Sequence, residues 1–274
     1  MQKGIINYYL QILKNIKVLK GRLNYYLSLL MASFYFIVKR RIVNPQRYFI
    51  GESIVLVNGV KLIVNKQTSF GFYLSLNFFE PNTFEYIGQV NGNIFIDVGA
   101  NAGGYTISFA KNFIKVLAIE PNPEMAKIIR RNSEINNYKN IEVIEAALSS
   151  YNGTGSFYIP DISSQVASLD RNWSYIKNIN VLTIQVQVMT LDTLIRNINY
   201  PTIDLIKIDA EGMEIEILNG AKEAFSKTKR IVIETEKTST KKVIQILKEN
   251  GYTVRFLEGN EELGGNLLAE KNIP

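Results

Sequence analysis

Cysteine and histidine are both absent from the 274 residues of the chain. Disulfide bonds, thiol nucleophiles and zinc sites built from Cys or His are therefore excluded. A histidine general base is excluded as well, so any proton acceptor must be a carboxylate, a lysine or a tyrosine. A bound metal ion would need oxygen ligands, and we expect no metal site.

Acidic residues are missing from the first 51 positions, which hold nine Lys or Arg, whereas the rest of the chain holds 22 basic and 25 acidic residues. The net charge of +6 thus belongs to the N-terminal segment, and nucleic acid is not an expected partner of the main body. Residues 1–41 are instead candidates for contact with an anionic membrane surface. We expect a cytoplasmic protein, either free or peripheral on the cytoplasmic face of the membrane. No feature indicates an oligomeric state.

Long apolar runs are also missing. Leu23 to Val38 would span only about 24 Å as a helix, less than the ~30 Å of a bilayer core, and no signal-peptide cleavage site follows. Residues 3–22 carry apolar side chains at helical spacing. We predict that residues 1–43 form a helical segment, which either packs on the body or lies in a membrane surface.

The next segment begins where Asn44-Pro45 interrupts the helical pattern. Asn58-Gly59 separates the apolar runs 53–57 and 60–64, which predicts a β-hairpin. We assign residues 44–92 to this hairpin and an aromatic-rich lead-in, and residues 93–274 to a cofactor-binding domain.

A strand, a glycine turn and a helix are predicted at residues 94–106, which read IFIDVGANAGGYT. Gly99, Gly103 and Gly104 permit positive φ and close approach of a ligand. Free N–H groups at the helix start can bind a polar group. The stretch is therefore a candidate site for a nucleotide-type cofactor, or else an ordinary strand-to-helix connection.

The remaining sequence alternates between strand and helix patterns. Strands are predicted at residues 116–119, 141–144, 181–188, 203–208 and 230–234. This alternation predicts an α/β fold with a mostly parallel, doubly wound sheet. No helix separates the last two strands, 252–257 and 265–270, so these should form an antiparallel hairpin at one edge.

Four of these strands end in an acidic residue: Asp97, Glu120, Glu145 and Asp209. Ligands of such sheets bind beyond the carboxyl ends of the strands. Glu120 follows the glycine turn by about 20 residues, the spacing of a carboxylate that holds ribose hydroxyls. Glu145 would then lie near an adenine edge and Asp209 at the reactive end.

The glycine turn argues against a dinucleotide, because Asn101 replaces the middle glycine that lets a pyrophosphate approach. A cofactor without phosphate fits better, and S-adenosylmethionine carries a positive sulfonium compatible with carboxylates. Two alternatives stay open: an NAD-binding oxidoreductase, and a non-catalytic, membrane-associated binding module of the same fold.

Five motifs occur in an order that resembles the FkbM-type methyltransferases: Asp97-Val-Gly-Ala-Asn-Ala-Gly-Gly-Tyr, Glu120-Pro-Asn-Pro, Glu145-Ala-Ala-Leu-Ser, Thr190-Leu-Asp192 and Ile206-Lys-Ile-Asp-Ala-Glu-Gly-Met-Glu214. The resemblance covers about residues 93–236. It implies a Rossmann-like class I fold with a seven-stranded sheet and S-adenosylmethionine as cofactor. It also implies O-methylation of a hydroxyl on a sugar, a glycan or another small hydroxylated metabolite.

The resemblance also implies roles for individual residues. Those implied to bind the cofactor are Asp97, Gly99, Ala100, Asn101, Gly103, Gly104, Glu120, Pro121, Glu145 and Ala146. Asp209 and Glu211 would lie beside the transferred methyl group.

Lys207 is unusual in an otherwise apolar strand, and alternation places it on the same face as Asp209. A buried lysine needs a partner, which Asp209 or Glu234 could supply. We hypothesise that Asp209 is the main catalytic carboxylate, tuned by Lys207 or Glu211, with Glu234 as a further candidate. The alternative is a structural Lys207–carboxylate pair that supports the turn.

Overall fold

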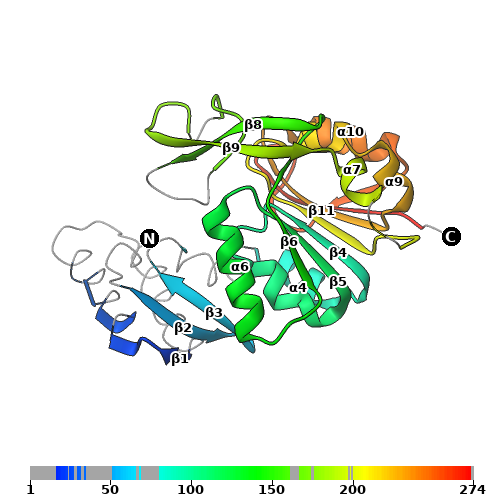
Figure 1. The fold of residues 1–274 in the computed structure, drawn as a ribbon. Coiled ribbons are helices and arrows are strands. Elements are labelled where there is room, and N and C mark those ends of the chain that lie inside the picture. Colours follow the sequence, from blue (N-terminus) through cyan, green and yellow to red (C-terminus); the bar gives the residue numbers. More distant parts are fainter. Residues whose placement is uncertain are drawn as a thin grey trace.

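Runs of Ile, Val, Leu and Phe form a seven-stranded sheet at the centre of the computed structural model (Figure 1). The structure describes residues 17–23, 25–27, 30–31, 34, 51–65, 68, 80–160, 167–173, 176–196, 198 and 200–272. In spatial order the strands are β12 (Thr253–Phe256), β13 (Gly264–Glu270), β11 (Arg230–Glu236), β10 (Leu205–Ile208), β4 (Gly92–Val98), β5 (Phe113–Ile119) and β6 (Ile141–Ile144).

All pairings in this sheet are parallel except those of β13, which is antiparallel to both β11 and β12. The predicted parallel sheet with an antiparallel C-terminal hairpin is thus confirmed. The chain runs from β4 to β6 in one direction across the sheet and later continues from β10 on the other side of β4. The strand order therefore reverses between β4 and β10, where open α/β sheets bind their ligands.

Helices cover both faces of the sheet. One face packs against α4 (Pro81–Gln89), α5 (Gly104–Phe109) and α6 (Pro123–Ile135). The other packs against α7 (Leu191–Arg196), α8 (Glu214–Asn219), α9 (Lys222–Lys227) and α10 (Thr240–Glu249). Asn122 caps α6 by accepting the Glu124 N–H, and Pro123 begins the helix, as its sequence indicates. The pattern analysis did not identify α4 and α9.

A second, three-stranded sheet interrupts the alternation after β6. It contains β7 (Ala147–Leu148), β9 (Val181–Met189) and β8 (Gly153–Pro160) in that order. Its long β8–β9 ribbon extends beside the carboxyl ends of the central strands (Figure 1).

The N-terminal region contains a third sheet, built from β1 (Lys17–Lys20), β2 (Glu52–Val57) and β3 (Val60–Asn65). The predicted hairpin is present, and its turn residues Asn58 and Gly59 both have positive φ. The predicted helix over residues 3–22 is wrong at its end: β1 pairs antiparallel with β2, with Val18 buried between exposed neighbours.

The described residues between 22 and 34 are helical, as predicted, whereas residues 1–16, 35–50 and most of the aromatic-rich lead-in lie outside the described part. No helix within the described ranges is long and apolar enough to cross a membrane.

Two asparagines, one within α6 and one at its C-terminal cap, join the β2–β3 hairpin to the rest of the fold. Asn132 is fully buried, accepts the N–H of Ile63 (2.8 Å) and donates to the carbonyl of Ala102 in the glycine turn (3.0 Å). Asn136 accepts the N–H of Lys61 (2.8 Å) in the same way, but at a partly exposed position. Asn132 therefore connects the hairpin edge to the turn that follows β4.

We expect Asn132→Ala to lower the free energy of unfolding by about 2–3 kcal/mol, because it removes two hydrogen bonds at a fully buried position. Asn136→Ala is the matched control and should cost roughly 1 kcal/mol or less, since water can replace its bonds. Urea denaturation of both variants measures the difference. Equal losses would contradict the bridging role of Asn132.

Candidate functional site

The ends of β4 and β10 meet so closely that only glycine fits between them. Gly99 has φ +75°, and a Cβ at this position would lie 1.8 Å from the carbonyl oxygen of Asp209. Gly99 therefore allows the turn after β4 to touch the turn after β10. Gly103, Gly104 and Ala100 are buried behind the turn and do not line the pocket beside it, so their assignment to the cofactor stays a prediction.

Asp97, near the end of β4, is fixed by α5. Its Oδ2 accepts the N–H (3.0 Å) and the hydroxyl (2.6 Å) of Thr106, and the residue is 1% exposed. Its Oδ1 is buried and has no hydrogen-bond partner in the described part of the chain. Asp97 lines neither of the two cavities described below, so its predicted contact with the methionine part of the cofactor stays a prediction.

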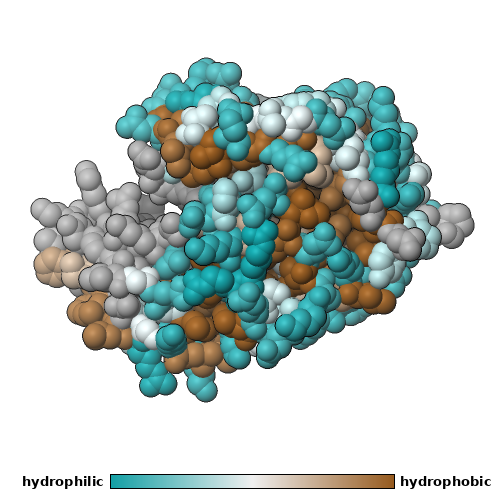
Figure 2. All heavy atoms as spheres, in the orientation of Figure 1, coloured by the Kyte–Doolittle hydropathy of each residue, from teal (hydrophilic) through white to brown (hydrophobic). Residues whose placement is uncertain are grey.

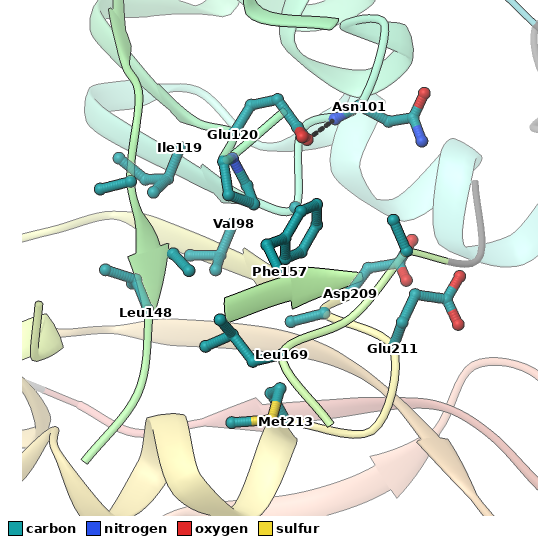
Figure 3. A pocket seen from close by; sticks show the side chains of 16 residues that line it. Val98, Asn101, Ile119, Glu120, Leu148, Phe157, Leu169, Asp209, Glu211 and Met213 are labelled. Carbon is teal, nitrogen blue, oxygen red and sulfur yellow. Dashed lines mark hydrogen bonds between the residues drawn. The ribbon is translucent and has the colours of Figure 1, made fainter. Parts of the chain in front are cut away.

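Two backbone N–H groups hold the carboxylate of Glu120, which follows β5, in position. Its Oε2 accepts the N–H of Asn101 (2.7 Å; Figure 3). Its Oε1 accepts the N–H of Asn122 (2.8 Å). Burial raises the pKa of Glu120 to about 7. The carboxylate retains lone pairs for ribose hydroxyls, as the spacing from the glycine turn predicts.

A pocket opens beside these residues, between the ends of the central strands and the β8–β9 ribbon. Its polar side chains are Asn101, Glu120, Asp209 and Glu211. Its apolar walls include Val98, Ile119, Pro121, Ala146, Leu148, Phe157, Leu169 and Met213 (Figure 3). We call this the cofactor pocket. A carboxylate followed by an aromatic and aliphatic wall suits a ribose joined to an adenine ring.

The sequence did not identify the wall formed by Phe157, Leu148 and Leu169. Alternation along β8 shows that Phe157 faces inward, but it does not show which cavity it faces. Glu145 differs from the expectation as well, because its carboxylate pairs with Arg130 (2.6 Å) at a partly exposed position outside the pocket. Ala146, the next residue, lines the pocket instead.

Lys207 and Asp209 form a buried ion pair of 2.9 Å. Lys207 is 2% exposed, and its ammonium lies 4.6 Å from the ring centre of Tyr105, whose hydroxyl donates to Glu80 (2.5 Å). Burial alone would lower the pKa of Lys207, but the nearby carboxylates of Asp209, Asp97 and Glu80 raise it. The lysine therefore stays protonated.

Glu234, near the end of β11, lies beside the carboxyl group of Asp209, close enough for the two groups to share a hydrogen bond. Two carboxyl groups can share such a bond only when one is protonated. The charge of Asp209 and burial raise the pKa of Glu234 well above its usual value. Burial opposes ionisation of Asp209 too, but Lys207 and the Glu234 bond outweigh it and lower the pKa of Asp209. Asp209 is thus the ionised member of the pair.

A second cavity, of about 620 Å³, lies on the other side of Asp209. We call it the acidic cleft, because its lining includes Asp209, Glu211, Glu214, Glu234 and Glu236, together with Trp173 and Lys237. Asp209 and Glu211 line the cofactor pocket as well, and their side chains lie next to each other at one end of it (Figure 3). The two cavities therefore meet at two carboxylates.

Glu211 has a positive φ of 52°, which is uncommon for a residue with a side chain. Burial, followed by the charge of Asp209, raises its pKa to about 9. The structure thus brings together the four predicted catalytic residues, Lys207, Asp209, Glu211 and Glu234. Glu80, Tyr105 and Glu214 lie there as well; the sequence analysis assigned no role to them, although Tyr105 and Glu214 end two of the quoted motifs. Within the described ranges, no group of three or more acidic side chains is arranged to hold a metal ion.

The parallel sheet, the glycine turn at the point where the strand order reverses and the carboxylate after β5 define a Rossmann-like protein that binds a nucleoside cofactor. Residues 97–254, more than half of the chain, match the family model described as the methyltransferase FkbM domain. The chain belongs to this family of methyltransferases, whose cofactor is S-adenosylmethionine.

Two known proteins of similar sequence are also named methyltransferases. Methyltransferase 1 of Beauveria bassiana (strain ARSEF 2860) is 26% identical over 141 residues, which cover 46% of this chain and 57% of that protein. Methyltransferase sdnD of Sordaria araneosa is 23% identical over 207 residues, 64% of this chain and 80% of the relative. The crystal structure of the FkbM methyltransferase from Methylobacillus flagellatus KT matches with a TM-score of 0.47 and 19% identity, over 72% of this chain and 47% of that one.

We expect Glu120→Ala to weaken binding of S-adenosylhomocysteine roughly tenfold to a hundredfold, because hydrogen bonds to a charged acceptor contribute about 1.5–3 kcal/mol. Isothermal titration calorimetry measures this change. Glu124→Ala, an exposed carboxylate in the first turn of α6, is the control and should bind normally. An unchanged affinity of Glu120→Ala would refute its contact with the ribose.

Proposed function

We propose that the protein is an S-adenosylmethionine-dependent O-methyltransferase that methylates a hydroxyl of a sugar, a glycan or another small hydroxylated metabolite. The observation that carries this proposal is the junction of the two cavities at Asp209 and Glu211. A cofactor in one cavity and an acceptor in the other would meet beside two carboxylates. Methyl transfer to a hydroxyl needs this arrangement, since the hydroxyl must be positioned and must lose its proton.

S-adenosylmethionine supplies a methyl group on a positive sulfonium and leaves as the neutral thioether S-adenosylhomocysteine. A lone pair of the acceptor oxygen forms the new O–C bond while the C–S electron pair returns to sulfur. The hydroxyl proton passes to a carboxylate of the protein. Asp209 is the available acceptor because Lys207 keeps it ionised.

Glu211, whose side chain lies next to that of Asp209, supports the same step. Its raised pKa keeps it protonated at neutral pH in the ligand-free protein, so it can donate a hydrogen bond to an acceptor oxygen. A nearby positive charge would lower this pKa and convert Glu211 into a second proton acceptor. Glu234 and Lys207 act through Asp209 as positioning residues, because each hydrogen-bonds to its carboxylate.

Transfer of labelled methyl groups from S-adenosylmethionine into small-molecule and glycan fractions of a cell extract tests this proposal. We expect a product that carries the label on oxygen. We also expect Asp209→Asn to reduce the rate at least a hundredfold, the scale of general base catalysis, with a change of less than about threefold in S-adenosylhomocysteine affinity.

The control is Glu216→Gln, an exposed carboxylate of α8 that should leave the rate unchanged. Label on nitrogen or carbon would overturn the proposed O-methylation. Full turnover by Asp209→Asn would remove its role as base. Binding of NAD without binding of either adenosyl compound would support the oxidoreductase alternative.

We also propose that the N-terminal region attaches to an anionic membrane surface. Large apolar side chains at helical spacing, Leu23, Leu27, Leu30 and Phe34, are between 43% and 73% exposed. The described residues of this region form apolar surface at the lower left edge of the molecule (Figure 2). Basic residues without acidic ones surround them in the sequence, the composition that favours anionic lipid headgroups.

Flotation with vesicles that contain phosphatidylserine should recover the protein, and vesicles of phosphatidylcholine alone should recover much less. We expect the double variant Leu27→Ser and Leu30→Ser to lose most of this binding, whereas Ile114→Ser, an exposed apolar residue of β5, should keep it. Point variants are preferred to deletion of residues 1–41, because deletion would remove β1 from its sheet. Equal flotation of both variants would contradict attachment through this surface.

A further inference from the structure

The lining of the acidic cleft holds five carboxyl groups and far fewer basic side chains. Glu214 from α8, Glu234 and Glu236 from β11 and the two junction carboxylates all line it. Lys207 lies behind this lining and is already paired with Asp209. Among the described residues that line the cleft, Lys237 is the cation, and it lies at an exposed position.

Glu214 is the second feature that points to a ligand. The residue is 4% exposed, and its Oε1 accepts the N–H of Gly212 at 2.9 Å. Its Oε2 has no hydrogen-bond partner in the described structure. Leaving a buried carboxylate oxygen unsatisfied costs free energy, and a ligand N–H donor in the cleft would remove this cost.

Trp173 forms an aromatic wall of the same cleft. It is 6% exposed, and its Nε1 donates to Oε1 of Glu236 at 2.6 Å. Gly212 packs against it so closely that a Cβ would lie 2.7 Å from the ring. An indole held beside carboxylates is a combination that binds ammonium groups, through cation–π attraction and charge-assisted hydrogen bonds.

We propose that the acceptor carries a protonated amine near the hydroxyl that is methylated, and that Glu214 and Glu236 hold this amine against Trp173. This inference rests on the proposed function and narrows its substrate class to amino sugars and other amino alcohols. A protonated amine has no free lone pair, so it cannot accept the methyl group. The hydroxyl oxygen, directed to the junction at Asp209 and Glu211, is therefore the nucleophile.

The charges of the cleft favour this acceptor over a neutral polyol. A neutral acceptor would add no positive charge beside Glu214 and Glu236, and burial would continue to oppose the ionisation of Glu214. In the ligand-free protein, ionisation of Glu214 is unfavourable. Burial, followed by the charges of Asp209 and Glu236, raises its pKa to about 7. An ammonium group would stabilise the ionised form of Glu214 and supply the donor that its Oε2 lacks.

Binding of matched probe pairs to the full chain, saturated with S-adenosylhomocysteine, tests the inference. The pairs are glucosamine with glucose and ethanolamine with ethylene glycol, measured by ligand-observed NMR titration. We expect the amine to bind at least tenfold more tightly in at least one pair. We expect Glu214→Gln to remove this preference and Glu216→Gln to keep it.

A thermal melt and S-adenosylhomocysteine affinity confirm that Glu214→Gln is folded, and Glu236→Gln provides a second variant with the same expected loss. Absence of an amine preference in both pairs, including absence of binding, overturns the inference. So does an O-methylated product from the extract that has no amino group, although that result leaves the proposed function intact. A product methylated on nitrogen overturns both.

Discussion

The buried ammonium of Lys207 controls the ionisation of the site around it. Asp97, Asp209 and Glu80 all raise its pKa, so one positive charge serves several carboxylates that are shielded from water. Removing an ion from water costs several kcal/mol, and this cost is offset only where partners are close. Asp209, at 2.9 Å, is the closest partner and stays ionised, whereas Glu234 holds a proton. A single lysine therefore determines which carboxyl group can accept a proton.

Backbone geometry places this chemistry between two cavities. Gly99 lets the turn after β4 contact the Asp209 carbonyl, so the turns after β4 and β10 form one unit. The chain then leaves the β10 turn through Glu211 in a left-handed conformation. Close contact of two strand ends, rather than a long loop, thus brings the cofactor pocket and the acidic cleft together.

The sequence was sufficient for features set by local patterns. Asn58-Gly59 predicted the hairpin, and acidic strand ends placed Asp97, Glu120 and Asp209 at one edge of the sheet. Features that depend on distant packing were not predictable. β1 was not predicted, because its apolar residues continue the helical spacing of the residues before it. Pairing with β2 outweighs this local preference for a helix. Sequence alone also cannot fix which residue at a strand end faces the cavity. A shift of one residue decides between Glu145 and Ala146, and Ala146 is the one that lines the pocket.

The burial of Lys207 has a consequence for the response of the protein to salt. Mobile ions cannot approach a side chain that is 2% exposed, so the electrostatic field inside the site should vary little with ionic strength. The basic N-terminal region is rich in charge without acidic neighbours, and fields at exposed positions are screened over about 8 Å at physiological salt. The proposed membrane attachment should therefore weaken as salt is added, whereas the field inside the site should change little.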